Sequence, residues 1–207
     1  MPAGEGSLAH RRHVPSKAIE LHSLTDRLEL DKIFGRKAPL HVDLGCAEGS
    51  FLCALAQRMR DKNFLGIERL LNRVRASARK AASLDNVRLL RMESSYAVRY
   101  LLPAGSVERF YLLFPDPWPK RRHHRRRIVT PNFLSSIYAA LQKNGRIYIA
   151  TDDVDYFERI QEIAESDPDF SIRDVNVELP ESRFARIFRE KSAPIHWLTL
   201  RKVSPVR

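Results

Sequence analysis

The sequence predicts an α/β protein whose sheet is doubly wound, Rossmann-like and mostly parallel, with an antiparallel edge pair. Short apolar runs alternate with helical segments of about a dozen residues, which is typical of a parallel sheet covered by helices on both faces. Two strand-like runs, 170–177 and 194–203, close the chain with only a polar, Arg-rich segment between them. A length of 207 residues with 43% apolar content is enough for one well-buried core.

The chain divides into a leading segment and one main domain. Residues 1–16 are predicted to form a basic arm, and residues 17–34 one or two helical turns that pack on the main domain. We therefore assign 1–38 to an N-terminal arm with a short helix and 39–207 to the main domain. No apolar run is long enough to span a membrane and the first residues lack a signal-peptide core, which predicts a cytoplasmic protein without a membrane partner.

The strands are predicted from apolar runs and the helices from apolar residues at helical spacing. Thr130 followed by Pro131 predicts a capped helix start, and Asn144-Gly145 predicts a turn. The basic stretch 117–129 is expected to be a loop. The predicted strands are 40–46, 63–68, 86–92, 107–114 and 146–150, and the predicted helices are 50–59, 71–83, 94–102, 131–142 and 155–166.

Chemistry is expected at the carboxyl ends of the strands, where open α/β sheets bind their ligands. The first strand is followed by Gly45 and Gly49, which predict a tight turn over which a ligand can approach the backbone. Ala47 breaks the dinucleotide fingerprint. Asp43 would repel a pyrophosphate but suits a cationic ligand, so the turn favours S-adenosylmethionine, with its sulfonium and ammonium groups, over NAD. A purely structural turn is the alternative.

Two further acids follow the next strands. Glu68 is placed to bind the ribose hydroxyls of an adenosine cofactor. Glu93 could accept from the adenine amine, or it could be an acid at a helix N-terminus. Asp152 ends the fifth strand and could contact a base, whereas Asp153 is expected to cap the next helix.

The fourth strand runs into a rigid loop and then into concentrated positive charge. Three prolines between 115 and 119 restrict the backbone that carries Asp116 and Trp118. Residues 120–127 contain six Lys and Arg side chains and no acid, in a chain whose formal net charge is +11. We expect Trp118 to stack on a base, Asp116 to accept from a guanine edge, and basic side chains such as Lys120, Arg122 and Arg126 to hold phosphates.

A solvated charge run is the alternative to a phosphate-binding one. Arg79, in another predicted helix, is taken as remote from this loop.

His123 and His124 are expected on the phosphate side rather than as metal ligands. Cys46 and Cys53 predict neither a disulfide nor a zinc site, and no metal is expected.

The string FPDPWPKRRHHRRR at 114–127 resembles the signature of the bacterial tRNA (guanine-N7-)-methyltransferase family, whose members have a class I S-adenosylmethionine-dependent fold. The strings HVDLGCAEG, LGIER, ESS and IATD agree with it in order, and the resemblance covers roughly residues 40–203. It implies S-adenosyl-L-methionine as methyl donor and N7 of the variable-loop guanosine of tRNA as acceptor. The expected protein is a monomer or a homodimer with tRNA as partner.

The resemblance also implies roles for particular residues. Asp43, Glu68, Glu93 and Asp116 match the family's cofactor-site acids, and Asp116 also matches its active-site residue. Lys120 and Asp152 match tRNA contacts. Ser182 keeps the hydroxyl of a late Thr-x-x-Glu contact whose Glu is here Ala185. Ala47 replaces a common glycine, which we expect to be tolerated only if its φ is negative.

Three other functions compete with this interpretation. A tRNA-binding protein with a decayed cofactor site would not bind S-adenosylmethionine. A small-molecule methyltransferase of the same fold would be insensitive to salt and inactive on tRNA. An NAD-dependent oxidoreductase is disfavoured by the broken fingerprint.

Overall fold

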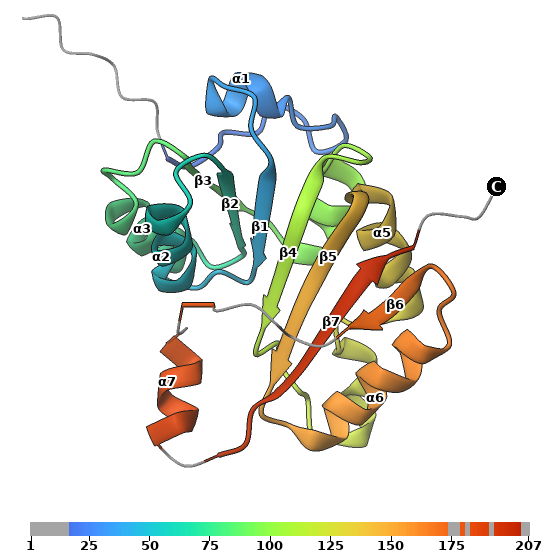
Figure 1. Ribbon diagram of the computed structural model, residues 1–207. Coiled ribbons are helices and arrows are strands. Elements are labelled where there is room, and N and C mark those ends of the chain that lie inside the picture. The colour runs from blue at the N-terminus through green and yellow to red at the C-terminus, as the bar shows by residue number, and fades with distance from the viewer. Residues whose placement is uncertain (1–16, 174–178, 181–182, 191–192, 204–207) are drawn as a thin grey trace, which may run out of the picture.

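Seven strands form one sheet in the computed structural model, which describes residues 17–173, 179–180, 183–190 and 193–203. The strands are β1 (Leu40–Leu44), β2 (Asn63–Glu68), β3 (Val87–Arg91), β4 (Val107–Leu113), β5 (Leu141–Thr151), β6 (Phe170–Arg173) and β7 (His196–Lys202). Their order is β3-β2-β1-β4-β5-β7-β6 (Figure 1). The first five are parallel, and β7 is antiparallel to both β5 and β6. The predicted sheet is therefore confirmed.

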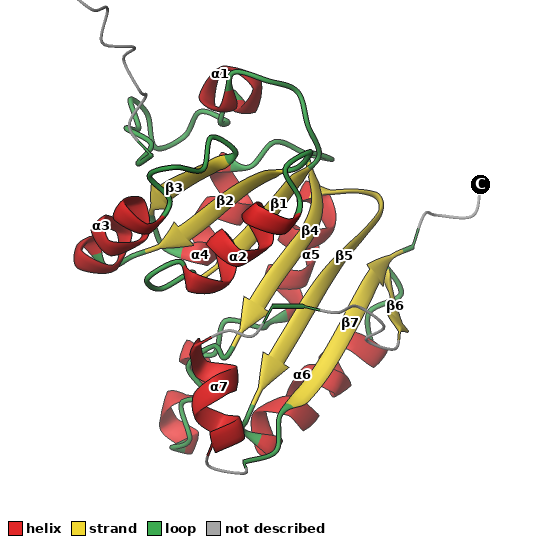
Figure 2. Cartoon of the chain, turned by 60° about the vertical axis from the view of Figure 1, so that its left-hand side comes forward, coloured by secondary structure: helices red, strands yellow, loops and turns green. Residues whose placement is uncertain are grey.

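Helices cover both faces of this sheet (Figure 2). The helices of the described residues are α1 (Leu30–Phe34), α2 (Ser50–Arg58), α3 (Leu71–Lys80), α4 (Ser94–Tyr96), α5 (Pro131–Ala140), α6 (Val154–Glu165) and α7 (Arg183–Glu190). There are also a π-helical segment η1 (Ala97–Leu101) and a 3₁₀ segment η2 (Arg121–Arg126). Among the described residues, no helix is long and apolar enough to cross a membrane.

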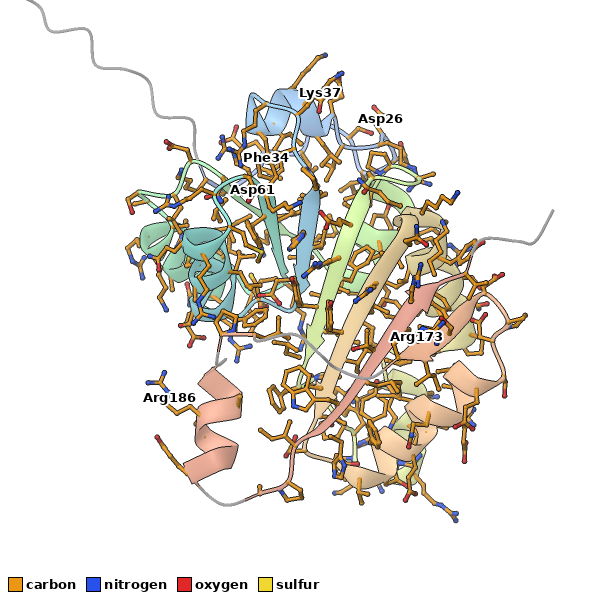
Figure 3. All side chains as sticks on the ribbon, in the orientation of Figure 1. Asp26, Phe34, Lys37, Asp61, Arg173 and Arg186 are labelled. Atoms are coloured by element: carbon orange, nitrogen blue, oxygen red, sulfur yellow. The ribbon has the colours of Figure 1, made fainter. Side chains whose placement is uncertain are left out.

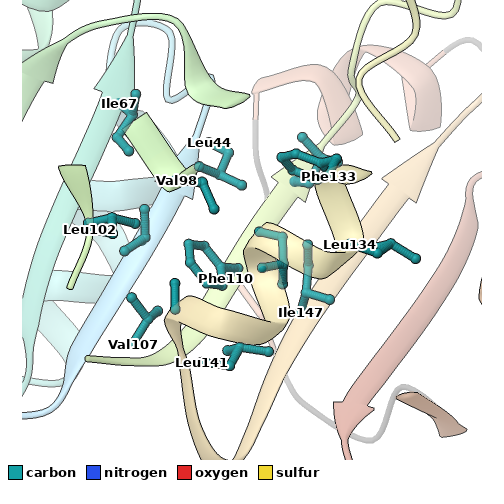
Figure 4. Packing of buried hydrophobic residues seen from close by; sticks show 14 of the residues in the cluster. Leu44, Ile67, Val98, Leu102, Val107, Phe110, Phe133, Leu134, Leu141 and Ile147 are labelled. Carbon is teal, nitrogen blue, oxygen red and sulfur yellow. The ribbon is translucent and has the colours of Figure 1, made fainter. Parts of the chain in front are cut away.

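The core has two parts because side chains alternate across each strand. On β4, Phe110 and Leu112 pack with the larger cluster, which includes η1, α5 and α6, whereas Tyr111 packs with α2 and α3. Figure 4 shows Phe110 in the larger cluster, to which Phe133 and Leu134 of α5 also belong. The apolar run 110–114, which is part of the predicted strand, is thus divided between the two faces of the sheet.

Two helix starts are set by their capping residues. The Thr130 hydroxyl accepts a hydrogen bond from the backbone N–H of Phe133 (3.1 Å), with Pro131 in the first turn. The Asp153 carboxylate accepts from the N–H of Tyr156 (2.8 Å). Both caps confirm their predictions. They fix where α5 and α6 leave the edge of the sheet that carries the strand ends.

Residues 17–38 pack on the sheet through apolar side chains. Leu28 and Phe34 are buried in the larger cluster, and Ala18 forms a parallel bridge with Leu89. Figure 3 shows Phe34 on the sheet side of α1, with the exposed Asp26 and Lys37 around it. A single short helix, α1, forms where one or two turns are predicted.

Several predicted boundaries are wrong. The first strand ends at Leu44, since Gly45 begins the turn with a positive φ. The segment 94–102 divides into α4 and η1, and β5 begins at Leu141 because that residue already pairs with Val107. Helix α7 occupies the segment expected to be a polar connection. The predicted strand 170–177 is confirmed for Phe170–Arg173, and residues 174–177 lie outside the described part.

Candidate functional site

A cleft of about 650 Å³ lies at the carboxyl ends of the parallel strands. Its walls come from the ends of β1, β2, β3 and β4 and from the loop that follows β4. Three carboxylates line it, those of Glu68, Glu93 and Asp116. The apolar part of the wall includes Met92, Leu112 and Leu113. The cleft therefore offers carboxylates and apolar surface together.

The glycine turn forms one wall of the cleft. Gly45 has a φ of 78° and lines the cleft, with nothing close to the position of a Cβ. Gly49 has a φ of 74°, but a Cβ there would lie 2.0 Å from Oγ of Ser77. The cleft walls do not include Gly49. Gly45 allows close approach of a ligand, whereas Gly49 allows α2 to pack tightly on α3.

Ala47 departs from the expected backbone conformation. Its φ is 49°, so the expectation that Ala is tolerated here only with a negative φ is wrong. A left-handed conformation costs a non-glycine residue roughly 1–2 kcal/mol. Its backbone N–H donates to the Glu68 carboxylate (3.2 Å), and this hydrogen bond helps to hold the turn in that conformation.

Glu68 links the ends of β1 and β2. Its side chain is buried, and it accepts hydrogen bonds from the backbone N–H groups of Ala47 (3.2 Å) and Leu70 (2.9 Å). The guanidinium of Arg73 lies 3.8 Å from it. These contacts fix the orientation of a carboxylate that faces the cleft.

Asp43 is buried behind the same turn. Burial, and then the nearby Glu68, raise the pKa of Asp43 to about 7. Leu44 and Gly45 line the cleft but Asp43 does not. Asp43 thus acts from behind the wall, where a bound cation would favour its ionised form.

Glu93 serves as a helix cap. Its two carboxylate oxygens accept from the N–H groups of Ser95 (2.9 Å) and Tyr96 (2.7 Å) at the start of α4. The helix-terminus alternative is therefore confirmed. Glu93 also lines the cleft, so its contact with adenine stays a prediction.

The loop after β4 carries Asp116 into the cleft wall. Phe114 (φ 55°) and Trp118 (φ 47°) both have left-handed backbones, which the proline spacing does not reveal. The exposed Asp116 and the half-buried Trp118 line the cleft. The guanidinium of Arg126 lies over the Trp118 ring, 4.9 Å from its centroid. An acid, an indole and a cation thus converge at one end of the cleft.

Arg127 fastens this loop to α6. It is buried, its Nε donates to the carbonyl of Pro117 (2.7 Å), and its Nη2 donates to Asp155 (2.5 Å). Its guanidinium also lies 4.7 Å from the ring centre of Tyr156. Arg127 is therefore an internal support of the loop, unlike the exposed Lys120, Arg122 and Arg126 that are predicted to hold phosphates.

The basic residues from Arg121 to Arg126 lie on η2, so the expectation of a loop across 117–129 is wrong in part. Lys120 precedes η2 and Arg122 lies within it, and both are exposed. The Arg122 Nε donates to Nε2 of His123 (3.3 Å). A charge run without apolar periodicity gives no sequence signal for such a helix.

The remaining predicted residues differ in where they lie and in whether the structure describes them. Asp152 is half-buried just after β5, and Ser182 lies outside the described residues. Ala185 lies on α7, and its segment has aromatic and aliphatic residues at helical spacing that could have predicted this helix. Trp197 lies on β7 and is half-buried.

Arg69 and Arg73 are wall residues that the sequence motifs did not indicate. Their position directly after the second strand is the signal that could have found them. Both cysteines are buried and free. In the described part of the chain, no group of three or more His, Cys, Asp or Glu side chains could hold a metal ion.

The sheet order, the antiparallel final strands and a cleft at the strand ends define a methyltransferase fold. The solved 16S rRNA methyltransferase KamB is similar to it with a TM-score of 0.62 and 16% identity, over 86% of this chain and 93% of that one. The antibiotic-resistance methyltransferase Kmr is similar with a TM-score of 0.58 and 14% identity, over 86% of this chain and 93% of that one. Such low identities show the fold alone.

Sequence comparison gives the family. A family model described as "Putative methyltransferase" matches residues 37–193. A tRNA (guanine-N(7)-)-methyltransferase of Alkalilimnicola ehrlichii is 33% identical over 91% of this chain and 83% of its own length. The chain belongs to the tRNA (guanine-N7-)-methyltransferase family. The relative from Thermotoga maritima is 36% identical over 85% of this chain, but the chain spans only 58% of that protein. The relative from Leifsonia xyli is 40% identical over 68% of this chain, and the chain spans 63% of that protein.

Proposed function

We propose that the protein transfers a methyl group from S-adenosyl-L-methionine to N7 of a guanosine in tRNA, the variable-loop guanosine at position 46. One observation carries the proposal. Asp116 lies on a loop that Arg127 holds to α6, and it lines the same cleft as Arg126, Glu68 and Glu93. Family membership supports the substrate, since the relatives are named for this reaction.

The cleft suits a cationic adenosine ligand. When bound, S-adenosylmethionine supplies a methyl group on a sulfonium centre. Glu68 would accept from the ribose hydroxyls, because its carboxylate is already oriented toward the cleft by two backbone N–H groups. Met92 and Leu112 offer apolar contact to the adenine ring, beside Glu93. Asp43 places a further acid behind the glycine turn.

Asp116 would orient the guanine and stabilise its product. Guanine N7 has an in-plane lone pair and no proton to lose, so the main tasks are alignment and electrostatics. The product guanine is cationic, and a fixed carboxylate beside it lowers the barrier. Trp118 offers a ring for stacking on the base. We assign Asp116 no role as a general base.

Lys120, Arg122 and Arg126 would hold the phosphates next to the target guanosine. All three are exposed and come after the loop that carries Asp116. Asp152, and Ser182 by family pattern, would add contacts to the base. A tRNA substrate also agrees with a cytoplasmic site of action, and either a monomer or a homodimer could bind it.

The test is incubation of the protein with unmodified tRNA and labelled S-adenosylmethionine, followed by nucleoside analysis. We expect label in N7-methylguanosine, and borohydride–aniline cleavage of the product within the variable loop. Cleavage elsewhere would refute the position, and label in another nucleoside would refute the atom. Label that appears only in a small acceptor would favour a small-molecule methyltransferase. Failure to bind the methyl donor would favour a tRNA-binding protein with a decayed cofactor site.

A further inference from the structure

The net charge of the chain resides in two segments. Residues 120–127 hold six cationic side chains and no acid, and residues 69–84 hold five and no acid. Together they equal the formal net charge of +11, so the rest of the chain is formally neutral. The proposed function uses only the first segment. The second contains α3 and its entry.

Helix α3 presents its cations outward. Val74 and Ser77 are buried and hold the helix on the protein. The five cationic residues of the segment are all exposed: Arg69, Arg73, Arg75, Arg79 and Lys80. The apolar side of α3 is thus buried against the rest of the protein, and its basic side is exposed and can bind a partner.

Two of these cations lie outside the cleft wall and have no visible structural task. Arg73 lies near Glu68, and Lys80 donates to the hydroxyl of Ser50 (2.5 Å). The side chains of Arg75 and Arg79 make no ion pair or hydrogen bond within the described part of the chain. They lie four residues apart on a helix without an acid, an arrangement that destabilises a helix in isolation. The fold gains nothing from keeping both charges.

Both basic segments border the same cleft. Arg69 and Arg73 lie in its wall, and so does Arg126 of η2. From that wall α3 runs for ten residues, about 15 Å, and its Ser77 touches Gly49 of the glycine turn. In Figure 1 α3 lies at the edge of the molecule, beyond α2. A polyanion centred on the cleft can therefore meet positive charge on two sides.

We propose that Arg75 and Arg79 form a second contact surface for the phosphodiester backbone of the tRNA whose guanosine occupies the cleft. The proposal rests on the function proposed above. A long polyanion fits two separated basic segments, whereas a small methyl acceptor would need neither. An anionic membrane is the weaker fit, because the apolar face of α3 is buried and cannot insert. Arg79 is thus unsuitable as a remote control for the loop after β4.

The test compares Arg75→Ala, Arg79→Ala and Arg75→Lys with Lys143→Ala. Lys143 is exposed near the start of β5, where β5 pairs with the first residue of β4, at the edge opposite the cleft. Affinity for unmodified tRNA is measured from 50 to 200 mM salt. Each Arg→Ala change should lower the slope of log K against log salt by roughly 0.7–0.9 units. KM for tRNA should rise while kcat at saturating tRNA stays unchanged.

The controls separate the explanations. Arg75→Lys should keep the wild-type slope, and Lys143→Ala should change neither slope nor KM. Equal losses for Lys143→Ala and the α3 variants, or unchanged slopes for both Arg→Ala variants, would overturn the proposal. So would losses seen only on phosphatidylserine vesicles. If the wild type makes no N7-methylguanosine, the proposed function fails, whereas the slopes still report whether α3 contacts RNA.

Discussion

Replacing Arg127 by Ala should destabilise the protein and weaken its chemistry without removing a phosphate contact. The change removes the charged donor to the Pro117 carbonyl (2.7 Å) and the cation over the Tyr156 ring. A hydrogen bond from a charged donor contributes about 1.5–3 kcal/mol, and a cation over an aromatic ring contributes about 2 kcal/mol where both groups are buried, as here. The expected loss of unfolding free energy is therefore about 3.5–5 kcal/mol. The exposed Asp155 adds nothing to this figure, since solvent screens its ion pair.

Urea unfolding at pH 7 measures this loss, with Arg125→Ala as the matched control. Arg125 is exposed on η2, so its removal should leave the unfolding midpoint almost unchanged. Turnover on tRNA should fall in Arg127→Ala, because the loop that carries Asp116 loses its link to α6. The dependence of tRNA binding on salt should remain that of the wild type.

A contrary result is easy to recognise. If Arg127→Ala unfolds at the same urea concentration as Arg125→Ala and its salt slope falls, then Arg127 contacts phosphate and the internal support is unimportant. Arg127→Lys sharpens the comparison, because one ammonium cannot reproduce both the forked donors and the stacking on Tyr156. We expect it to recover only part of the lost stability.

Three further predictions concern the carboxylates of the cleft. Asp116→Asn should lower turnover by roughly 10²–10³-fold with little effect on tRNA affinity, and a near-wild-type rate would reduce Asp116 to a turn residue. Glu68→Ala should weaken S-adenosylmethionine binding by about 1.5–3 kcal/mol in calorimetry; unchanged binding would place the cofactor elsewhere. Since the folded pKa of Asp43 is about 7, above its ordinary value of 3.8, the folded state holds an extra proton and stability should fall as pH rises from about 4 to about 7. Asp43→Asn should abolish that part of the pH dependence in thermal unfolding, and a wild-type profile in this variant would contradict the assignment.

Much of the sheet and its strand ends could be predicted because their signals are local. An apolar run before Gly45 or Pro115 indicates a strand end, and Thr130 before Pro131 gives a helix start that needs no tertiary information. The acids Glu68, Glu93 and Asp116 do meet in one cleft, since parallel strands bring their carboxyl ends to one edge.

The errors arise where tertiary contacts decide. The positive φ of Ala47 depends partly on a carboxylate from the next strand. Arg127 looks like its neighbours in a run of cations, and only burial against α6 distinguishes it. Helix η2 forms in a segment of almost pure charge, where no periodicity can appear. Glu93 has two compatible roles, and its sequence position cannot choose between them.

The stack of Arg126 on Trp118 gives the cleft a built-in optical reporter. The chain has two tryptophans, Trp118 in the cleft wall and Trp197 on β7. A nucleobase that takes the place of the guanidinium on the indole face would change the emission of Trp118, without any added label. With Trp197 replaced by Phe, a single indole would report the arrival of RNA, and stopped-flow traces could then time base entry separately from methyl transfer.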